Sequence, residues 1–287
     1  MSGDGSVLIG ASYGAAPHGN FLFISVDGGA FARNYAAGNR LWMGVAVSHN
    51  GSMIAAVAWG HAMYVSRDRG ATWTARDTTR NWWAVDCSAD GSRIYAIADT
   101  LPGVVRASAD SGVTWTSMNF LSTATASRGV ATNGDGSLVL VAVYLGNLYV
   151  SSNFGAAWAL SLSSNVGWQF VRISRDGSLM LACESSLRMS RDRGASWTQY
   201  TTISGQWKSA GISANGNSIV ATAFQGRVYT SADAGVSFTP RLTTGDWWPS
   251  AISDDGSKML AGAGGQYWTP SRLQFSGDSG LTWAVVA

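Results

Sequence analysis

Short apolar stretches of strand character alternate along the chain with tight polar turns. One unit, beginning at Trp42, reads in order WMGVAVS, HNGS, MIAAVAW, GHA, MYVS, RDRGA and TWTA. Asp-Gly or Asn-Gly between β-forming residues is a strong hairpin signal, because both residues tolerate positive φ. The pattern therefore predicts units of four strands joined by hairpins, with no helix between them.

The polar turns are of two kinds, and each kind occurs seven times. The first is an Asp/Asn-Gly-Ser-like tripeptide, which starts at Asp4, Asn50, Asp90, Asp135, Asp176, Asn215 and Asp255. The second has the form Ser-x-Asp-x-Gly-x-Thr-Trp, and it starts at Ser25, Ser66, Ser108, Ser151, Ser190, Ser231 and Ser276. A unit of about 40 residues with four strands is typical of a β-propeller. We expect an all-β, seven-bladed β-propeller of four-stranded antiparallel blades, with residues 1–287 as a single domain.

The first unit starts at the turn Asp4-Gly5, so no earlier stretch could supply its innermost strand. We therefore expect blade one to lack that strand. Its open edge is either shielded by the narrow channel and the two long neighbouring loops, or left by trimming from a longer protein. An open edge could support association with another chain; otherwise we expect a monomer.

The second turn resembles the Asp box, or BNR repeat, of sialidases, sortilin-type receptors, some xyloglucan-active glycosidases and photosystem II stability factors. The resemblance implies a hairpin at the outer edge of each blade, whose Asp binds turn amides and whose aromatic residue packs between blades. It also favours an extracellular or cell-surface protein. On this basis structural roles are expected for Asp27, Asp68, Asp110, Asn153, Asp192, Asp233 and Asp278.

Charge and composition exclude several classes of protein. Nineteen Lys plus Arg against 17 Asp plus Glu give a net charge of +2, too little for a nucleic-acid footprint. No apolar run is long enough to insert into a membrane, and no signal peptide is visible at the start. Cys87 and Cys183 have no metal or redox spacing, so no metal and no cofactor is expected.

Aromatic residues recur at the start of the innermost strand of most units. Pairing that strand with the next across a two-residue turn sets Trp42 opposite Trp59 and Trp82 opposite Asp99, with Ser127 opposite Tyr144 in the following unit. These ends lie away from the Asp-Gly turns, on the face where the longest loops, 13–25 and 264–276, emerge. The candidate ligand-binding residues of this face are Trp83, Trp248, Trp42, Trp59, Trp82, Trp168, Trp207, Trp247, Arg40, Arg80, Tyr144, Tyr267 and Trp268.

Two interpretations of these aromatic residues remain open. Exposed rings can stack on sugars, and Trp, Tyr and Arg also dominate protein–protein hot spots. Alternatively, a Trp that recurs at one position of most units fills the wedge between blades. Trp83 and Trp248, one residue later, should point to the other side of their sheets and are the better candidates for ligand contact.

The sequence favours a non-catalytic binding module, carbohydrate-binding and lectin-like, with a protein–protein interaction scaffold as the alternative. An exo-acting, sialidase-like glycoside hydrolase is the second alternative. The sialidase catalytic set is missing, since Glu184 is the only Glu and no Phe/Tyr-Arg-Ile-Pro motif occurs. His18, His49 and His61 lack metal-ligand spacing and are interpreted as solvated residues. No catalytic residue is therefore predicted.

Asp86 and Arg172 replace small residues at one position of the innermost strand. They are expected to make buried or channel-lining polar contacts, with a channel ligand as the alternative.

Overall fold

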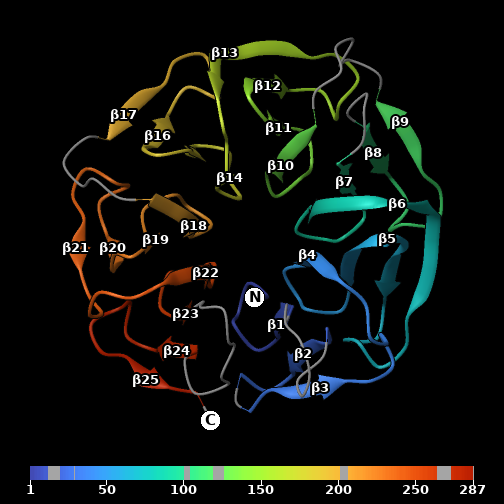
Figure 1. Ribbon diagram of the computed structural model, residues 1–287, viewed down its shortest axis with the longest axis horizontal. Coiled ribbons are helices and arrows are strands. Elements are labelled where there is room, and N and C mark those ends of the chain that lie inside the picture. Colours follow the sequence, from blue (N-terminus) through green and yellow to red (C-terminus); the bar gives the residue numbers. More distant parts are fainter. Residues whose placement is uncertain are drawn as a thin grey trace.

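The computed structural model describes residues 1–11, 20–28, 30–99, 104–118, 126–200, 206–263 and 273–286. The sheets of this part of the chain are arranged radially around a central axis, with the first strand of each sheet innermost (Figure 1). Every regular element of the described residues is a β-strand. Accordingly, they contain no helix that could span a membrane.

The strands form six hydrogen-bonded sheets. The first sheet has three strands, β1 (Leu8–Ala11), β2 (Leu22–Ser25) and β3 (Ala32–Asn34). The second has six strands, β4 (Trp42–Val47), β5 (Ile54–Ser66), β6 (Thr74–Cys87), β7 (Ile94–Ala98), β8 (Val104–Ser108) and β9 (Thr116–Met118).

Each of the other four sheets has four strands. The third sheet comprises β10 (Ser127–Thr132), β11 (Val139–Val143), β12 (Gly146–Ser151) and β13 (Ala159–Val166). The fourth comprises β14 (Phe170–Ile173), β15 (Met180–Cys183), β16 (Leu187–Ser190) and β17 (Thr198–Tyr200). The fifth comprises β18 (Gln206–Ile212), β19 (Ile219–Phe224), β20 (Val228–Ser231) and β21 (Thr239–Pro240). The sixth comprises β22 (Trp247–Ile252), β23 (Met259–Ala263), β24 (Leu273–Ser276) and β25 (Ala284–Val285).

The prediction of seven four-stranded blades is wrong. With each hydrogen-bonded sheet taken as one blade, the propeller has six blades, and the seven sequence units are distributed over them. The cause is β6, which pairs with β5 through residues 74–81 and with β7 through residues 82–87. This strand leaves the outer edge of one unit and becomes the inner strand of the next without a break, so two units share one sheet.

Two kinds of turn connect the strands, and their polar side chains satisfy the turn backbone. In the turns between the first two strands of a unit, here called inner turns, Asp90 Oδ1 accepts bonds from Ser88 Oγ at 2.6 Å and Ser92 N at 2.9 Å. In the hairpins that begin Ser-x-Asp, here called outer turns, Ser66 Oγ accepts from the buried amide of Gly70 at 2.8 Å. Asp68 accepts from Thr72 N, also at 2.8 Å.

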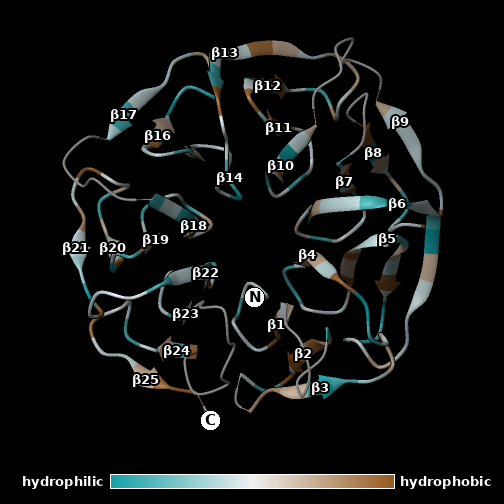
Figure 2. Ribbon diagram, in the orientation of Figure 1, coloured by the Kyte–Doolittle hydropathy of each residue, from teal (hydrophilic) through white to brown (hydrophobic). Residues whose placement is uncertain are grey.

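The core lies between neighbouring sheets. The middle strands are its densest part, since all residues of β11 and β15 are buried, whereas the outermost strand β17 is largely exposed. Figure 2 shows the same contrast, with hydrophobic segments on strands such as β2 and β24 and hydrophilic ones on β17. Both faces of a sheet are buried against neighbouring sheets, so the strands do not alternate between apolar and polar positions.

A closed ring of backbone hydrogen bonds joins the inner turns around the central axis. The first turn lies between two others, since Gly3 N donates to His49 O and Asp254 N donates to Gly3 O, both at 2.8 Å. The remaining links run from His49 N to Ala89 O, Ala89 N to Gly134 O, Gly134 N to Arg175 O, Asp176 N to Ala214 O, and Ala214 N to Asp254 O. The ring therefore ties the first sheet to the last.

Candidate functional site

The innermost strand carries a β-bulge near its first residue in five units. Next to the inner turn the pairing follows the two-residue rule, as for Gly44 opposite Val57. Beyond the bulge the register shifts by one, so Trp42 pairs with Ala58 rather than Trp59, Trp82 with Ala98, and Ser127 with Val143. The predicted cross-strand pairs at this edge are therefore wrong by one residue. The same shift follows Trp207 and Trp247.

A bulge inserts one extra residue and re-aims the side chains around it. The extra positions hold Trp83, Arg128, Lys208 and Trp248, besides Met43 and Pro249. Two of these are the aromatic residues that the sequence singles out, and the other two are cations. The four lie at the edge of the propeller remote from the inner turns. The outer turns lie next to the inner turns, as shown by Ser111 N of an outer turn, which donates to Ser92 O of an inner turn. The bulge residues are therefore remote from the outer turns as well.

The first group of side chains, here called the Arg128 cluster, consists of Trp59, Trp83, Asp99, Arg128 and Tyr144. The Arg128 guanidinium carbon lies 3.9 Å from the ring centroid of Trp83 and 4.9 Å from that of Tyr144. Arg128 Nη1 also donates to Asp99 Oδ2 at 2.9 Å. Trp59 meets Trp83 edge-on with centroids 6.1 Å apart. The cluster is charge-neutral and half-buried, apart from Tyr144, which is 38% exposed.

The second group, here called the Lys208 cluster, consists of Lys208, Phe224 and Trp248. Lys208 Nζ lies 5.4 Å from the Trp248 ring centroid and 5.7 Å from that of Phe224. The two rings meet edge-on at 6.5 Å. Trp248 is 50% exposed, whereas Lys208 and Phe224 are half-buried. Within the described part of the chain, Lys208 forms no ion pair.

Five Trp residues recur near the start of the inner strand segments, and all five are core residues. Their exposed fractions do not exceed 6%, the value for Trp247. Four of them donate their indole N–H to a backbone carbonyl, for example Trp82 to Thr78 O at 3.3 Å and Trp168 to Gly146 O at 3.0 Å. Trp207 Nε1 is buried and has no partner among the described residues. Because both ring faces are packed, these five rings offer no free face to a ligand. The buried set is Trp42, Trp82, Trp168, Trp207 and Trp247.

The remaining candidates have separate surroundings. Arg40 stacks on Tyr64, with its guanidinium carbon 4.2 Å from the ring centroid. Arg80 is half-buried and pairs with His61 across β5 and β6. Tyr267 and Trp268 lie outside the described residues. Within the described residues, no ion pair or cation–π contact joins Arg40 or Arg80 to the Arg128 or Lys208 cluster.

Asp86 and Arg172 each link neighbouring inner strands. Asp86 Oδ2 accepts from Thr132 N at 2.9 Å, joining β6 to β10. Arg172 Nε donates to Ala210 O at 3.0 Å, joining β14 to β18. Desolvation raises the pKa of Asp86 and lowers the pKa of Arg172. Both side chains are thus engaged by backbone groups, which is a structural role.

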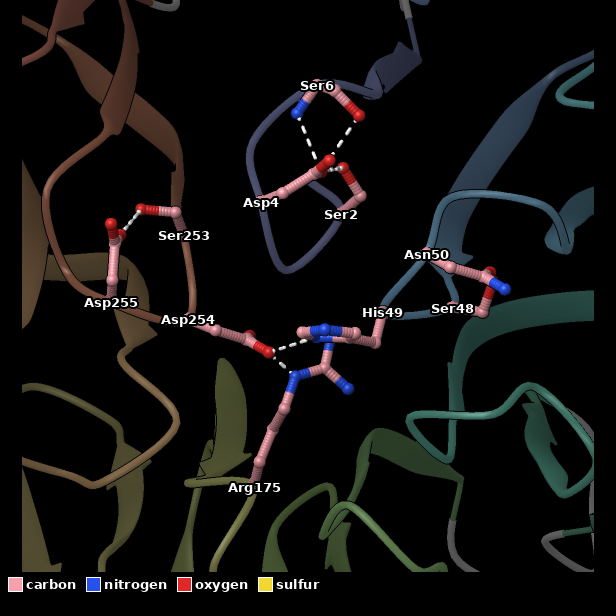
Figure 3. Close-up of polar contacts among 10 residues, drawn as sticks. All are labelled: Ser2, Asp4, Ser6, Ser48, His49, Asn50, Arg175, Ser253, Asp254 and Asp255. Atoms are coloured by element: carbon pink, nitrogen blue, oxygen red, sulfur yellow. Dashed lines mark hydrogen bonds and ion pairs between the residues drawn. The ribbon is translucent and has the colours of Figure 1, made fainter.

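A polar cluster occupies the opposite edge, at the inner turns (Figure 3). Asp254 Oδ1 accepts from Arg175 Nε at 2.6 Å, and Asp254 Oδ2 lies 2.5 Å from His49 Nδ1. The side chains of Asp254 and Arg175 are 20% and 24% exposed. His49, interpreted from the sequence as a solvated residue, is 55% exposed but paired.

The sequence carries a signal for this cluster at one repeat position. His49, Arg175 and Asp254 each stand directly before the Asp or Asn of an inner turn. Other units have Gly or Ala at that position, namely Gly3, Ala89, Gly134 and Ala214. Three charged or polar exceptions at one repeat position indicate side chains that converge on the axis.

Groups that could serve nucleophilic chemistry are held in structural contacts. Glu184 accepts from Arg188 Nη2 at 3.1 Å and lies near the hydroxyls of Ser185 and Ser186. The thiols of Cys87 and Cys183 are buried, and desolvation raises the pKa of both well above its usual value. A thiol that does not ionise is a poor nucleophile.

Comparisons with known proteins bear on the fold. No family model matches the chain, and no curated protein matches it. Among solved structures, YCF48 bound to D1 peptide is 14% identical with a TM-score of 0.65, covering 86% of this chain and 82% of that one. YCF48 from Cyanidioschyzon merolae is 17% identical with a TM-score of 0.64, covering 86% and 84%.

Two further solved structures have similar TM-scores. An ancestral GH74 enzyme is 14% identical with a TM-score of 0.67 over 82% of this chain, but over only 36% of its own length. The β-propeller domain of Cps50 (Swd1) from Myceliophteria thermophila is 10% identical with a TM-score of 0.68, covering 92% of both chains. At such low identity, these likenesses establish a β-propeller fold.

Proposed function

We propose that the chain is a non-catalytic binding module that holds a polypeptide partner at the Arg128 and Lys208 clusters. The observation that carries this proposal is the repeated β-bulge, which places Trp83, Arg128, Lys208 and Trp248 at one edge of the propeller. Bulges next to binding sites commonly serve to aim side chains. All four residues lie within hydrogen-bonded strands, β6, β10, β18 and β22, which supports a preorganised site.

The composition of the two clusters supports a polypeptide ligand. Trp, Tyr and Arg are the residue types that contribute most to protein–protein binding energy. Arg128 covers the face of Trp83 and approaches that of Tyr144, so these faces are less free for a sugar ring. The structurally similar YCF48 has been solved with D1 peptide bound, which supports the same ligand class on this fold.

A carbohydrate ligand is the second candidate, favoured by Trp248. Half of this side chain is exposed, and Lys208 lies 5.4 Å from its ring centroid. An exposed indole face beside a hydrogen-bond donor suits the C–H face and hydroxyls of a sugar. If the ligand is a carbohydrate, Trp248 would supply the stacking surface alone, because the five core Trp rings are buried.

Membership of the Asp-box propellers is a further part of the proposal. The outer turns repeat one hydrogen-bond pattern. The Ser hydroxyl accepts from a Gly amide, as Ser190 Oγ does from Gly194 N. The Asp carboxylate accepts from the amide four residues after the Asp, as Asp192 Oδ1 does from Ser196 N. The side chain of the aromatic residue that follows is half-buried, as for Trp197. These contacts support stability roles for the outer turns, away from the ligand.

The proposal is tested by screening the protein against an array of 15-residue peptides and a glycan array in parallel. We expect the wild-type protein to be retained on a subset of the peptides, and we expect this retention to be lost in Trp83→Ala and Trp248→Ala. The control is Thr78→Ala, an exposed residue of β6 away from both clusters. Retention on glycans alone, lost in Trp248→Ala, would favour the second candidate, and retention on neither array would refute both.

A further inference from the structure

The Arg128 and Lys208 clusters combine the same kinds of side chain, although the bulge Trp belongs to the unit before Arg128 in one and to the unit after Lys208 in the other. In each, a cation at the bulge of one unit lies among aromatic rings contributed by the ends of neighbouring strands. Arg128 contacts Trp83 and Tyr144, and Lys208 contacts Trp248 and Phe224. Tyr144 and Phe224 occupy the same place in their units, directly after the second strand or at its end.

The two clusters differ in how their charge is balanced. Arg128 is paired with Asp99, 2.9 Å away, which follows the second strand of the preceding unit. The equivalent position in the unit before Lys208 is Ser185, which carries no charge. The nearby acid of that unit, Glu184, is bound by Arg188 at 3.1 Å. Within the described residues, Lys208 therefore has aromatic neighbours but no carboxylate at ion-pair distance.

From this difference we infer that the Lys208 cluster takes a carboxylate from an acidic side chain of the bound polypeptide. The inference rests on the proposed function and specifies its ligand. An ammonium held between rings is partly desolvated, so an approaching carboxylate meets a stronger field than at a free surface lysine. Trp248 lies at the open side, where an apolar residue next to the acid would pack on its exposed face.

The two clusters lie on strands at different sides of the central axis (Figure 1), and they would have distinct roles in holding the polypeptide. The Arg128 cluster, already neutral, supplies apolar and hydrogen-bonding contact without a charge requirement. The Lys208 cluster supplies the charge selection. A peptide with an acidic residue beside a large apolar residue fits this arrangement, and its amide counterpart does not.

The test uses an array of paired 15-residue peptides that differ only in Glu or Gln beside one central Leu, incubated with the full chain. We expect about fivefold stronger retention on the Glu member of each retained pair. The ratio should fall to about one in Lys208→Met, which keeps the length of the side chain but removes its charge, and should be restored in Lys208→Arg. Arg128→Met is the matched comparison, because it should lower total retention while the ratio persists.

Each outcome decides between the two claims. A wild-type ratio near one, or a ratio that survives in Lys208→Met, overturns the carboxylate assignment and leaves peptide binding intact. No retention on any peptide overturns the proposed function together with this inference. Retention on immobilised polygalacturonate in place of peptides would also overturn it, because the carboxylate would then belong to a saccharide. Melting temperatures of the variants confirm that each one folds.

Discussion

Asp254 accepts a 2.6 Å hydrogen bond from Arg175, although 79 residues separate the two in sequence. The second oxygen of the same carboxylate is paired with His49. One carboxylate thus ties together three inner turns from different sheets, at the edge opposite the proposed ligand site. Its effect should be on the stability of the ring.

We expect Asp254→Asn to lower the free energy of unfolding by about 1 kcal/mol, because two partners lose a partly buried charged acceptor. Urea denaturation checks this value. A double-mutant cycle with Arg175→Gln should show coupling, since the two side chains share one contact. Additive effects in that cycle would contradict a direct interaction.

The outer turns should govern stability without affecting ligand binding. Ser66 is 1% exposed, and its hydroxyl accepts from the buried amide of Gly70. Ser66→Ala leaves that amide unsatisfied, which should cost about 1–3 kcal/mol. Thermal and urea unfolding measure the loss, with Thr78→Ala as the exposed control. Peptide retention that fell while the melting temperature stayed unchanged would argue against this division of roles.

Acid should weaken the fold through the turn carboxylates. Hydrogen bonds from Ser6 N to Asp4, and from the hydroxyls of Thr114, Ser196 and Thr282 to Asp110, Asp192 and Asp278, hold the pKa of each of the four carboxyls at about 2. The unfolded value is about 3.9, so the folded state binds protons more weakly. This stability is present above about pH 4 and is lost as the pH falls towards about 2.

Urea midpoints measured between pH 6 and pH 2 (about one per pH unit) test this dependence. Asp192→Asn keeps an acceptor oxygen but cannot titrate, so its loss of stability over this range should be smaller than that of the wild type. An equal slope for both proteins would rule out a contribution from Asp192.

Trp207 and Trp248 should respond oppositely to replacement by Ala. Trp207 is fully buried and packs against Tyr229 and Phe238, so Trp207→Ala should cost about 3–5 kcal/mol of unfolding free energy. Trp248 is half-exposed, so Trp248→Ala should change stability little and abolish ligand retention. Tryptophan fluorescence and urea titration separate the two effects. A large stability loss in Trp248→Ala would place that ring in the core.

Several of these features could be read from the sequence, because they depend on local chemistry. The two turn types follow from Ser, Asp and Gly at fixed spacing, as at Ser88 to Gly91, and the propeller follows from their repetition. The pairing next to each inner turn also obeys the two-residue rule, as for Val45 opposite Ala56.

What the sequence did not reveal depends on contacts between units. A bulge adds one residue without changing the hydrophobic pattern, so the shift after Trp82 could not be seen. The same holds for the uninterrupted strand β6, which reduces seven units to six sheets. For Trp42, repetition alone could not separate packing from ligand contact, and its 2% exposure decides that it belongs to the core.

The closed ring of backbone bonds at the inner turns has a mechanical consequence. A linear array of repeats frays from its two terminal repeats, which have a neighbour on one side only. Here the turn at Gly3 bonds to neighbours on both sides, so the circle offers no terminal repeat at which separation could start. Releasing any one unit requires breaking the backbone hydrogen bonds to both neighbouring inner turns. The propeller should therefore unfold in a single cooperative transition under force or denaturant.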